Sequence, residues 1–314
     1  MSIDPCGRDD GDSSKPGNRQ LTRRACLGSL AAVAATGVGG VASATDEYEL
    51  VELSPGERHH VEIEGGDSLE NVLYDQTAEG SQVVISARGA DWTIRNVGVA
   101  GPNVGHGAQF GVADTGGGTS TIENVYLGDG AIDAHRTGLG IWVAPDHRGV
   151  LEIERVNVQG MGDNSFYCSA PGSDGEVHID SCYSKDSWVA HYRLARGSVT
   201  NSVAVNTSAG RDGRGLWAWA PGPVEVEGCS FAMNGRHFSF DVGANNSASQ
   251  VRVVDTEYDT GRDGGSTVNG ALDLRSGNGT DPVDEVPDGC PTTAEEAAGG
   301  DETRVWSPFV GRRH

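Results

Sequence analysis

The sequence predicts an all-β fold, a single-stranded right-handed parallel β-helix of about eight coils with three short strands per coil. Glycine occupies 47 of the 314 positions and hydrophobic residues make up 36%, a composition too rich in turn formers for a helical bundle and too apolar for a wholly disordered chain. A four-residue pattern, in which apolar residues flank a turn former, recurs with successive copies starting 21 to 31 residues apart. This period is typical of a solenoid and is too short for a propeller blade or a two-helix repeat.

Residues 1–44 are predicted to be an export signal. The paired Arg23 and Arg24 precede an Ala/Gly/Val run at 28–41 and an Ala-Ser-Ala end at 42–44. This order is that of a signal peptide, and the arginine pair makes it similar to a twin-arginine signal. The run is too weakly apolar for a stable membrane span. We therefore expect the mature chain to begin near Thr45 and to be extracellular or located at the cell surface.

Residues 45–66 are predicted to form a strand cap and residues 67–275 the β-helix itself. The turn former of each repeat is the expected bend between two strands, because almost all of these residues tolerate a left-handed backbone or bond to their own backbone locally. Arg155 is the exception. Stacked asparagines at the bend are expected to hydrogen-bond from coil to coil. The expected bend residues are Asn71, Asn96, Asn124, Arg155, Ser181, Ser202, Gly228 and Asp255.

The strand upstream of each bend pattern is taken as the first strand of its coil. Aligning the recurring Ala-Pro and Ala-Arg ends of these strands brings apolar and aromatic residues into one column, which we expect to face inward. The residues two positions further on, Ser169 and Trp219 among them, are expected to share that side. The inward column is predicted to contain Val84, Phe110, Ile141, Tyr167, Tyr192, Trp217, Phe240 and Leu272.

Residues 276–314 are rich in Gly, Asp, Pro and Glu and are predicted to be an acidic linker or loosely held arm, with Trp306 and Phe309 docking on the coils. Cys182 and Cys229 are expected to be buried free thiols, because two coil spacings, roughly 9.6 Å, exceed the roughly 7 Å limit for a disulfide. Cys168 is expected to point outward, where it could pair with Cys290.

In repeat architecture and bend asparagines, residues 67–275 resemble the pectin-lyase-like superfamily of parallel β-helix proteins. The resemblance implies a substrate groove along the outward side of the first strands and the loops that enter them. On this side Trp142 and Phe166 are expected to stack on sugar faces, and Arg236 and His237 to bind hydroxyls or uronates. The catalytic candidates on the same side are Asp133, His135, His191, Arg193, Asp212 and Arg214.

Two reactions could use such a groove. A β-eliminating lyase would use calcium, held by Asp163, Asp186 and Asp241, to acidify the proton beside a uronate carboxylate. Arg193 or His191 would then remove that proton. A glycoside hydrolase would instead need two carboxyls about 5 to 9.5 Å apart. Candidate pairs come from Asp133, Asp163, Asp186 and Asp212. Neither set matches the catalytic signature of pectate lyases or polygalacturonases, so the sequence leaves open whether the protein is an enzyme.

The charge balance bears on the partner. The chain has 45 acidic and 23 basic residues, a formal net charge of −22, and its only lysines are Lys15 and Lys185. This acidic, lysine-poor composition resembles that of extreme halophiles and argues against sequence-independent binding to nucleic acid. We expect a secreted monomer that binds a polysaccharide or surface glycan. The alternative is a non-catalytic cell-surface or matrix β-helix that serves as an adhesive surface or a spacer.

Overall fold

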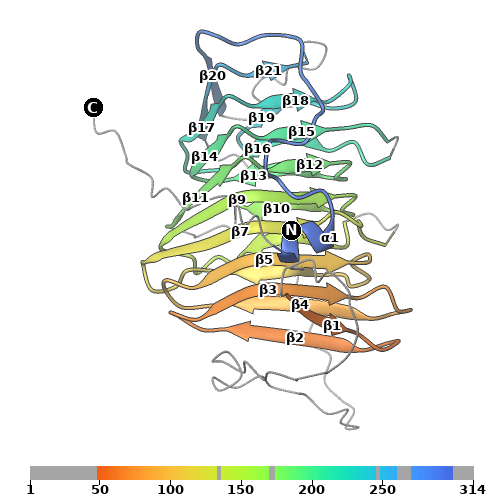
Figure 1. Ribbon diagram of the computed structural model, residues 1–314. Helices are drawn as coiled ribbons and strands as arrows, with labels where there is room; N and C mark the ends of the chain where they lie inside the picture. The colour runs from red at the N-terminus through yellow and green to blue at the C-terminus, as the bar shows by residue number, and fades with distance from the viewer. Residues whose placement is uncertain are drawn as a thin grey trace, which may run out of the picture. The chain divides into compact units, whose positions relative to one another are not determined.

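The computed structural model describes residues 48–132, 136–169, 174–208, 210–244, 248–259 and 270–299, all within the unit Val38–His314. In this unit parallel sheets stack as a β-solenoid of about eight turns (Figure 1). The predicted all-β fold is therefore confirmed. The predicted export signal at 1–44, and also Trp306 and Phe309, lie outside the described residues.

Two parallel sheets form the walls of the solenoid, a 14-stranded sheet A and an 8-stranded sheet B. Each coil runs through sheet A, bends, continues in sheet A and then crosses to sheet B. The main path of sheet A contains β1 (Glu49–Glu52), β3 (Ser68–Asp75), β5 (Thr93–Ala100), β7 (Thr119–Leu127), β9 (Val150–Gln159), β11 (Glu176–Asp180), β14 (Gly197–Thr200), β17 (Val224–Glu227), β20 (Ser249–Val254) and β22 (Gly270–Leu274). After the bend come β12 (Tyr183–Lys185), β15 (Val203–Val205), β18 (Ser230–Ala232) and β21 (Glu257–Tyr258). Sheet B contains β2 (Arg58–Ile63), β4 (Gln82–Ala87), β6 (Ala108–Val112), β8 (Leu139–Val143), β10 (Asn164–Cys168), β13 (Ala190–Leu194), β16 (Arg214–Ala218) and β19 (Phe240–Val242).

The first two strands belong to the same stack as the later ones. β1 pairs in parallel with β3, and β2 pairs in parallel with β4. Residues 49–63, in the segment predicted as a cap, thus occupy the positions that the two sheets repeat in every following coil.

A single residue with positive φ makes the bend in each coil of sheet A. The φ values at these eight positions lie between 46° and 65°, and only one of the residues is glycine. In the early coils β3, β5, β7 and β9 run through the bend, whereas later coils break into two strands there. The sequence identified seven of the eight positions; at the eighth the bend is at Asn201 and not at Ser202. The bend residues are Asn71, Asn96, Asn124, Arg155, Ser181, Asn201, Gly228 and Asp255.

The bend asparagines form the predicted ladder. Asn96 Nδ2 donates to Asn71 Oδ1 at 2.7 Å, and Asn124 Nδ2 donates to Asn96 Oδ1 at 2.8 Å. In the next coil Arg155 replaces asparagine at the bend and forms ion pairs with Glu123 and Glu154. These hydrogen bonds run along the stack, so they connect coils at the point where the backbone is most constrained.

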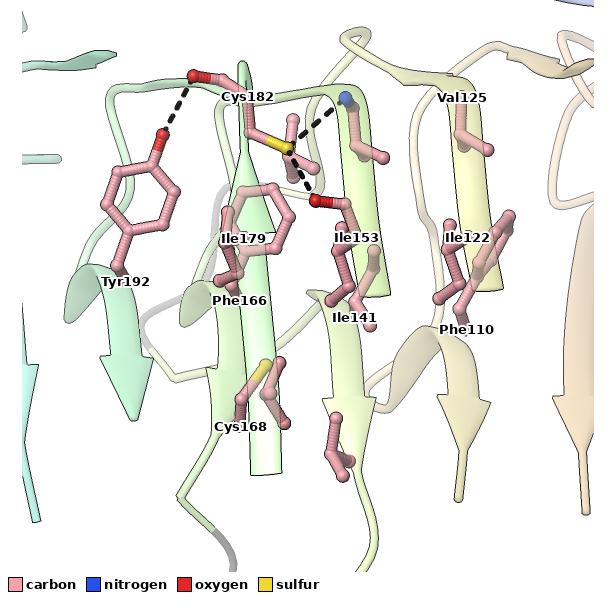
Figure 2. Close-up of a cluster of buried hydrophobic side chains, with 14 of the residues drawn as sticks. Phe110, Ile122, Val125, Ile141, Ile153, Phe166, Cys168, Ile179, Cys182 and Tyr192 are labelled. Carbon is pink, nitrogen blue, oxygen red and sulfur yellow. Dashed lines mark hydrogen bonds between the residues drawn. The ribbon is translucent and has the colours of Figure 1, made fainter. Parts of the chain in front are cut away.

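The interior is filled by apolar side chains from both sheets (Figure 2). The pairing register of sheet B gives an inward column of Ile85, Phe110, Ile141, Phe166, Tyr192, Leu216 and Phe240, all fully buried. The predicted column is therefore correct at Phe110, Ile141, Tyr192 and Phe240. It is wrong by one residue at Val84, Tyr167 and Trp217, since a one-residue slip moves a side chain to the opposite face of a strand.

The alignment on Ala-Pro ends caused this slip. β8 ends at Val143, directly before an Ala-Pro pair in the sequence. β10 ends at Cys168 and β16 at Ala218, and there the Ala-Pro pair follows one residue later in the sequence. Leu272 was misplaced for a different reason. It lies on β22, which pairs with β20 in sheet A and not with the strands of sheet B. Phe166 and Cys168, predicted to face outward, are consequently buried in the core.

The segment after β22 is packed against the solenoid and is not loosely held. It runs back along sheet A, where Val283 O accepts a hydrogen bond from Ser230 Oγ at 2.6 Å and Pro291 O accepts one from Asn157 Nδ2 at 2.8 Å. Its helix α1 (Ala294–Gly299) packs on Leu73 and Tyr126. A Cβ on Gly98 would collide with the carbonyl of Ala294, so glycine is required where α1 approaches β5. We call residues 276–299 the arm.

Cys168, Cys182, Cys229 and Cys290 are all buried and free. This confirms the two free thiols predicted at Cys182 and Cys229. The suggested Cys168–Cys290 pairing is wrong. Cys168 packs in the core, whereas Cys290 lies in the arm and packs on Tyr183 and Val203. Burial raises the pKa of the Cys290 thiol to about 12, so the thiol is protonated at neutral pH.

Candidate functional site

The outer face of sheet B presents one side chain per coil in a straight row. The register aligns each member with the next across adjacent strands, which lie about 4.8 Å apart. The residues on either side of each member along its strand point into the core, so alternation directs the row outward. We call these residues the outer row: Gly111, Trp142, Tyr167, Arg193, Trp217 and Asp241.

Arg193 lies within the outer row in a cage of aromatic rings. Its Cζ is 3.9 Å from the ring centroid of Tyr167, 4.6 Å from that of Trp217 and 4.1 Å from that of Trp219. Nε donates a hydrogen bond to Ser169 Oγ at 2.7 Å. Burial lowers the pKa of Arg193 to about 10, which leaves the guanidinium charged at neutral pH. None of the ion pairs among the described residues includes Arg193.

A second guanidinium lies beside this cage. Arg214 Nε is 2.5 Å from Asp241 Oδ2, and its Cζ lies 4.4 Å from the ring centroid of Trp217. The Trp217 ring therefore contacts two arginines. Asp241 is almost fully buried, so its pairing with Arg214 supplies the compensation that a buried carboxylate needs.

A cleft of about 450 Å³ opens on the same face at the earlier coils. The loop 104–107, with His106, forms one part of its lining, and Trp142 forms another. Gly111 lies between them, and a Cβ there would meet only the Trp142 ring, at 3.8 Å. The missing side chain at Gly111 thus leaves one flat side of Trp142 accessible from the cleft. Cleft and cage together give the outer face an aromatic, hydrogen-bonding and cationic character.

Four of the predicted site residues lie on this face, namely Trp142, Arg193, Arg214 and Asp241. Phe166, predicted to bind sugar, is fully buried in the core, and that placement was wrong. Asp133 and His135 lie outside the described residues. Three others, Asp212, Arg236 and His237, are half-buried in the loops that precede β16 and β19.

His191 points into the solenoid and not toward solvent. Strand pairing skips this position on both sides of β13, and the successive residues His191 and Tyr192 are both fully buried. Its Nδ1 lies 2.7 Å from Ser184 Oγ and its Nε2 lies 2.9 Å from Asn206 Oδ1. The predicted outward position of His191 is therefore wrong, because the alternation of inward and outward side chains is interrupted at this residue.

Both ring nitrogens of this imidazole have hydrogen-bond partners. Asn206 Nδ2 donates to Gly213 O at 2.8 Å, which leaves Asn206 Oδ1 to accept from Nε2–H of His191. Nδ1 lies within hydrogen-bond distance of the Ser184 hydroxyl, which also donates to Ser165 Oγ at 2.8 Å. Burial lowers the pKa of His191 to about 4, in agreement with a neutral ring.

The three carboxylates predicted to hold calcium have separate partners. Asp163 Oδ1 accepts from Asn164 Nδ2 at 2.5 Å, Asp186 accepts from Thr207 and Ser208, and Asp241 pairs with Arg214. Among the residues that the structure describes, no three His, Cys, Asp or Glu side chains are arranged to bind a metal ion. Asp163, Asp186 and Asp241 are therefore not gathered into one metal-binding group.

Sequence reasoning missed Tyr167, Trp217, Trp219 and Ser169, which build the cage. Their signal was present in β10, because Phe166 and Cys168 are apolar while Tyr167 and Ser169 carry hydroxyls. An alignment on that alternation would have placed the four residues outward.

No protein-family model, curated protein or solved structure matches the chain. Within the described ranges, no helix has the length and apolar character needed to cross a membrane.

Proposed function

We propose that the protein binds polysaccharide along the outer face of sheet B, with the glycan chain following the axis of the stack. The observation that carries this proposal is the outer row itself, in which Trp142 and Tyr167 lie on adjacent coils and Trp217 lies two coils further on. Aromatic rings stack on the apolar faces of sugars, and the cleft beside Trp142 supplies the concave start of such a path.

Charge on this face favours a glycan with anionic or hydroxyl-rich residues. Arg193 and Arg214 are the cations of the cage. Asp241 pairs directly with Arg214, whereas Arg193 interacts with Asp163 only at longer range. Fixed guanidinium groups recognise carboxylates and hydroxyls with defined geometry. The proposal includes the resemblance to pectin-lyase-like proteins, export by a twin-arginine signal to the cell exterior of a halophile, and a monomeric state.

Catalysis is a separate part of the proposal. A lyase or glycoside hydrolase activity would act on a glycan bound to the outer row, and a non-catalytic surface or matrix protein would bind without cleaving. We favour binding as the primary function, because the buried His191 is removed from the predicted catalytic set.

The test is a binding and product screen with the full chain against neutral and acidic polysaccharides in high salt, with and without calcium. Affinity electrophoresis measures binding, and unsaturated products and new reducing ends report cleavage. Trp142→Ala should weaken binding at least tenfold, about 1.4 kcal/mol. Leu50→Ala, at an exposed position on sheet A, is the control and should bind normally. The proposal fails if no glycan is retained, or if Trp142→Ala binds as tightly as the wild type.

A further inference from the structure

A second depression, of about 350 Å³, lies where strands of sheet A end and the loops toward sheet B begin. Four successive coils contribute to it, because the strand ends stack in register. Its lining includes Asp129, Gly130, Gly160, Lys185, Asp186 and Arg211. We call it the Lys185 pocket. None of these residues belongs to the outer row.

The two carboxylates of the pocket already have donors for all their oxygens. Asp129 Oδ2 accepts from Gly101 N at 2.6 Å and its Oδ1 accepts from the Tyr126 hydroxyl at 3.1 Å. Asp186 Oδ1 accepts from the backbone N–H groups of Thr207 and Ser208, at 2.6 and 2.8 Å. Its Oδ2 accepts from Thr207 Oγ1 at 2.7 Å. These hydrogen bonds connect the acids to the surrounding loops.

The ammonium group of Lys185, unlike these carboxylates, has no hydrogen-bond partner among the described residues. It is the one lysine in the described part of the chain, and no side-chain hydrogen bond or ion pair connects it to any described residue. An ammonium group carries three donors and no acceptor. In a chain with a net charge of −22, this cation is half-buried in a pocket whose carboxylates are already hydrogen-bonded.

Arg211 adds a second cation to the pocket. Its Nη2 donates to the carbonyl of Ala131 at 3.2 Å, which holds the guanidinium over the glycine-lined wall. A Cβ on Gly160 would lie 3.5 Å from Arg211 Nη1, so the absence of a side chain there makes room for the guanidinium. The pocket therefore offers two cations as N–H donors, beside two hydrogen-bonded carboxylates, over a wall that includes several glycines.

We propose that the Lys185 pocket binds a small oxyanion, that is, a sulfate, phosphate or carboxylate group, through the Lys185 ammonium and the Arg211 guanidinium. Both cations donate hydrogen bonds to such a group, and charge-assisted bonds of this kind are the stronger ones. The oxyanion is either a free inorganic ion or a substituent on a sugar. This site is independent of glycan binding by the outer row.

The experiment follows the ¹³Cε signal of lysine by NMR in the full chain, where Lys15 and Lys185 are the only two lysines. Lys185→Arg assigns the signals. Sodium sulfate and sodium phosphate are titrated against sodium chloride at equal ionic strength, because sulfate also acts on the whole protein surface. The Lys185 signal should shift with saturation, and the Lys15 signal should not.

Matched variants locate the second cation. Arg211→Gln should weaken sulfate binding at least tenfold, whereas Arg252→Gln, on the outside of sheet A, should leave it unchanged. A second arm uses glucose 6-sulfate; tighter binding than inorganic sulfate assigns the oxyanion to a sugar, and equal binding assigns it to a free ion. The proposal is overturned if the Lys185 signal fails to saturate with every probe, or if chloride produces the same shift.

Discussion

The guanidinium carbon of Arg193 lies 3.9 Å from the ring centroid of Tyr167 on the neighbouring strand, and Trp217 approaches the same group from the strand on the other side. The cation is thus inserted between aromatic residues of adjacent coils. Cation–π contacts contribute up to about 2 kcal/mol each when the cation is desolvated. The cage therefore adds side-chain contacts between three coils that are otherwise connected on this face by backbone hydrogen bonds.

Arg193→Met removes the charge and keeps most of the side-chain length. We expect the free energy of unfolding to fall by about 2 kcal/mol, measured by urea denaturation. Arg193→Lys should recover only part of this loss, because an ammonium group cannot stack as a planar guanidinium does. Arg252→Met, at an exposed pair with Glu225, is the control and should change stability little. Wild-type stability in Arg193→Met would show that the cage adds nothing.

His191 should make stability depend on pH. Its pKa is lowered to about 4 in the folded protein, against about 6.5 in the unfolded chain, so the unfolded state binds more protons between these values. The stability contribution of the neutral ring is complete above pH 6.5 and is lost as pH falls toward 4. The full loss is about 3 kcal/mol.

The measurement compares urea unfolding of the wild type and His191→Gln from pH 7.5 to 4. The variant lacks the titrating group, so the stability difference between the two proteins should shrink as pH falls through this window. Carboxylates titrate in both proteins and cancel in the difference. A difference that stays constant with pH would contradict the neutral, buried state of His191.

The bend ladder gives a pair of variants at one position. Asn96→Ala loses two ladder hydrogen bonds and forces alanine to adopt a φ of 54°, so we expect a loss of about 2 to 4 kcal/mol. Asn96→Gly loses the same hydrogen bonds without the steric cost and should recover about 1 kcal/mol or more. Equal losses in the two variants, measured by denaturant unfolding, would mean that the left-handed backbone imposes no cost here.

Gly98→Ala tests the packing of α1 against β5. The added Cβ would collide with the Ala294 carbonyl, so we expect α1 to detach from β5 while the coils remain folded. Limited proteolysis followed by mass spectrometry should show cleavage within 294–299 at lower protease concentration than in the wild type. Gly107→Ala, where a Cβ meets nothing within 4 Å, is the matched control. An unchanged cleavage pattern in Gly98→Ala would argue against the required glycine.

The bend positions could be predicted because their requirement is local. A left-handed backbone selects Asn, Asp, Gly or Ser, and these types are visible in the sequence. The exception was a position where Asn201 and Ser202 are adjacent and both suit a bend. The face of each sheet B strand was harder to predict, since the loops that enter it vary in length and a one-residue error reverses every side chain.

The same uncertainty in strand register limited the prediction of the candidate site. Trp142 and Arg193 were placed correctly, because their coils aligned in the right register. Tyr167 and Trp217 were assigned to the core and Phe166 to the surface, each by a shift of one residue. His191 could not be placed by alternation, because strand pairing skips that residue and two successive side chains are buried.

The position of α1 on early coils affects how the chain can reach its final state. Asn124 Nδ2 donates to the carbonyl of Ala297, a contact that spans 173 positions of sequence. A stack that grows from its N-terminal coils leaves Leu73 and Tyr126 exposed until α1 is available to cover them. Each coil otherwise contacts only its neighbours, as in other solenoids. The arm therefore connects the C-terminal coils directly to the early coils in an otherwise linear array. Release of α1 should lower the cooperativity of unfolding across all the coils that the arm spans.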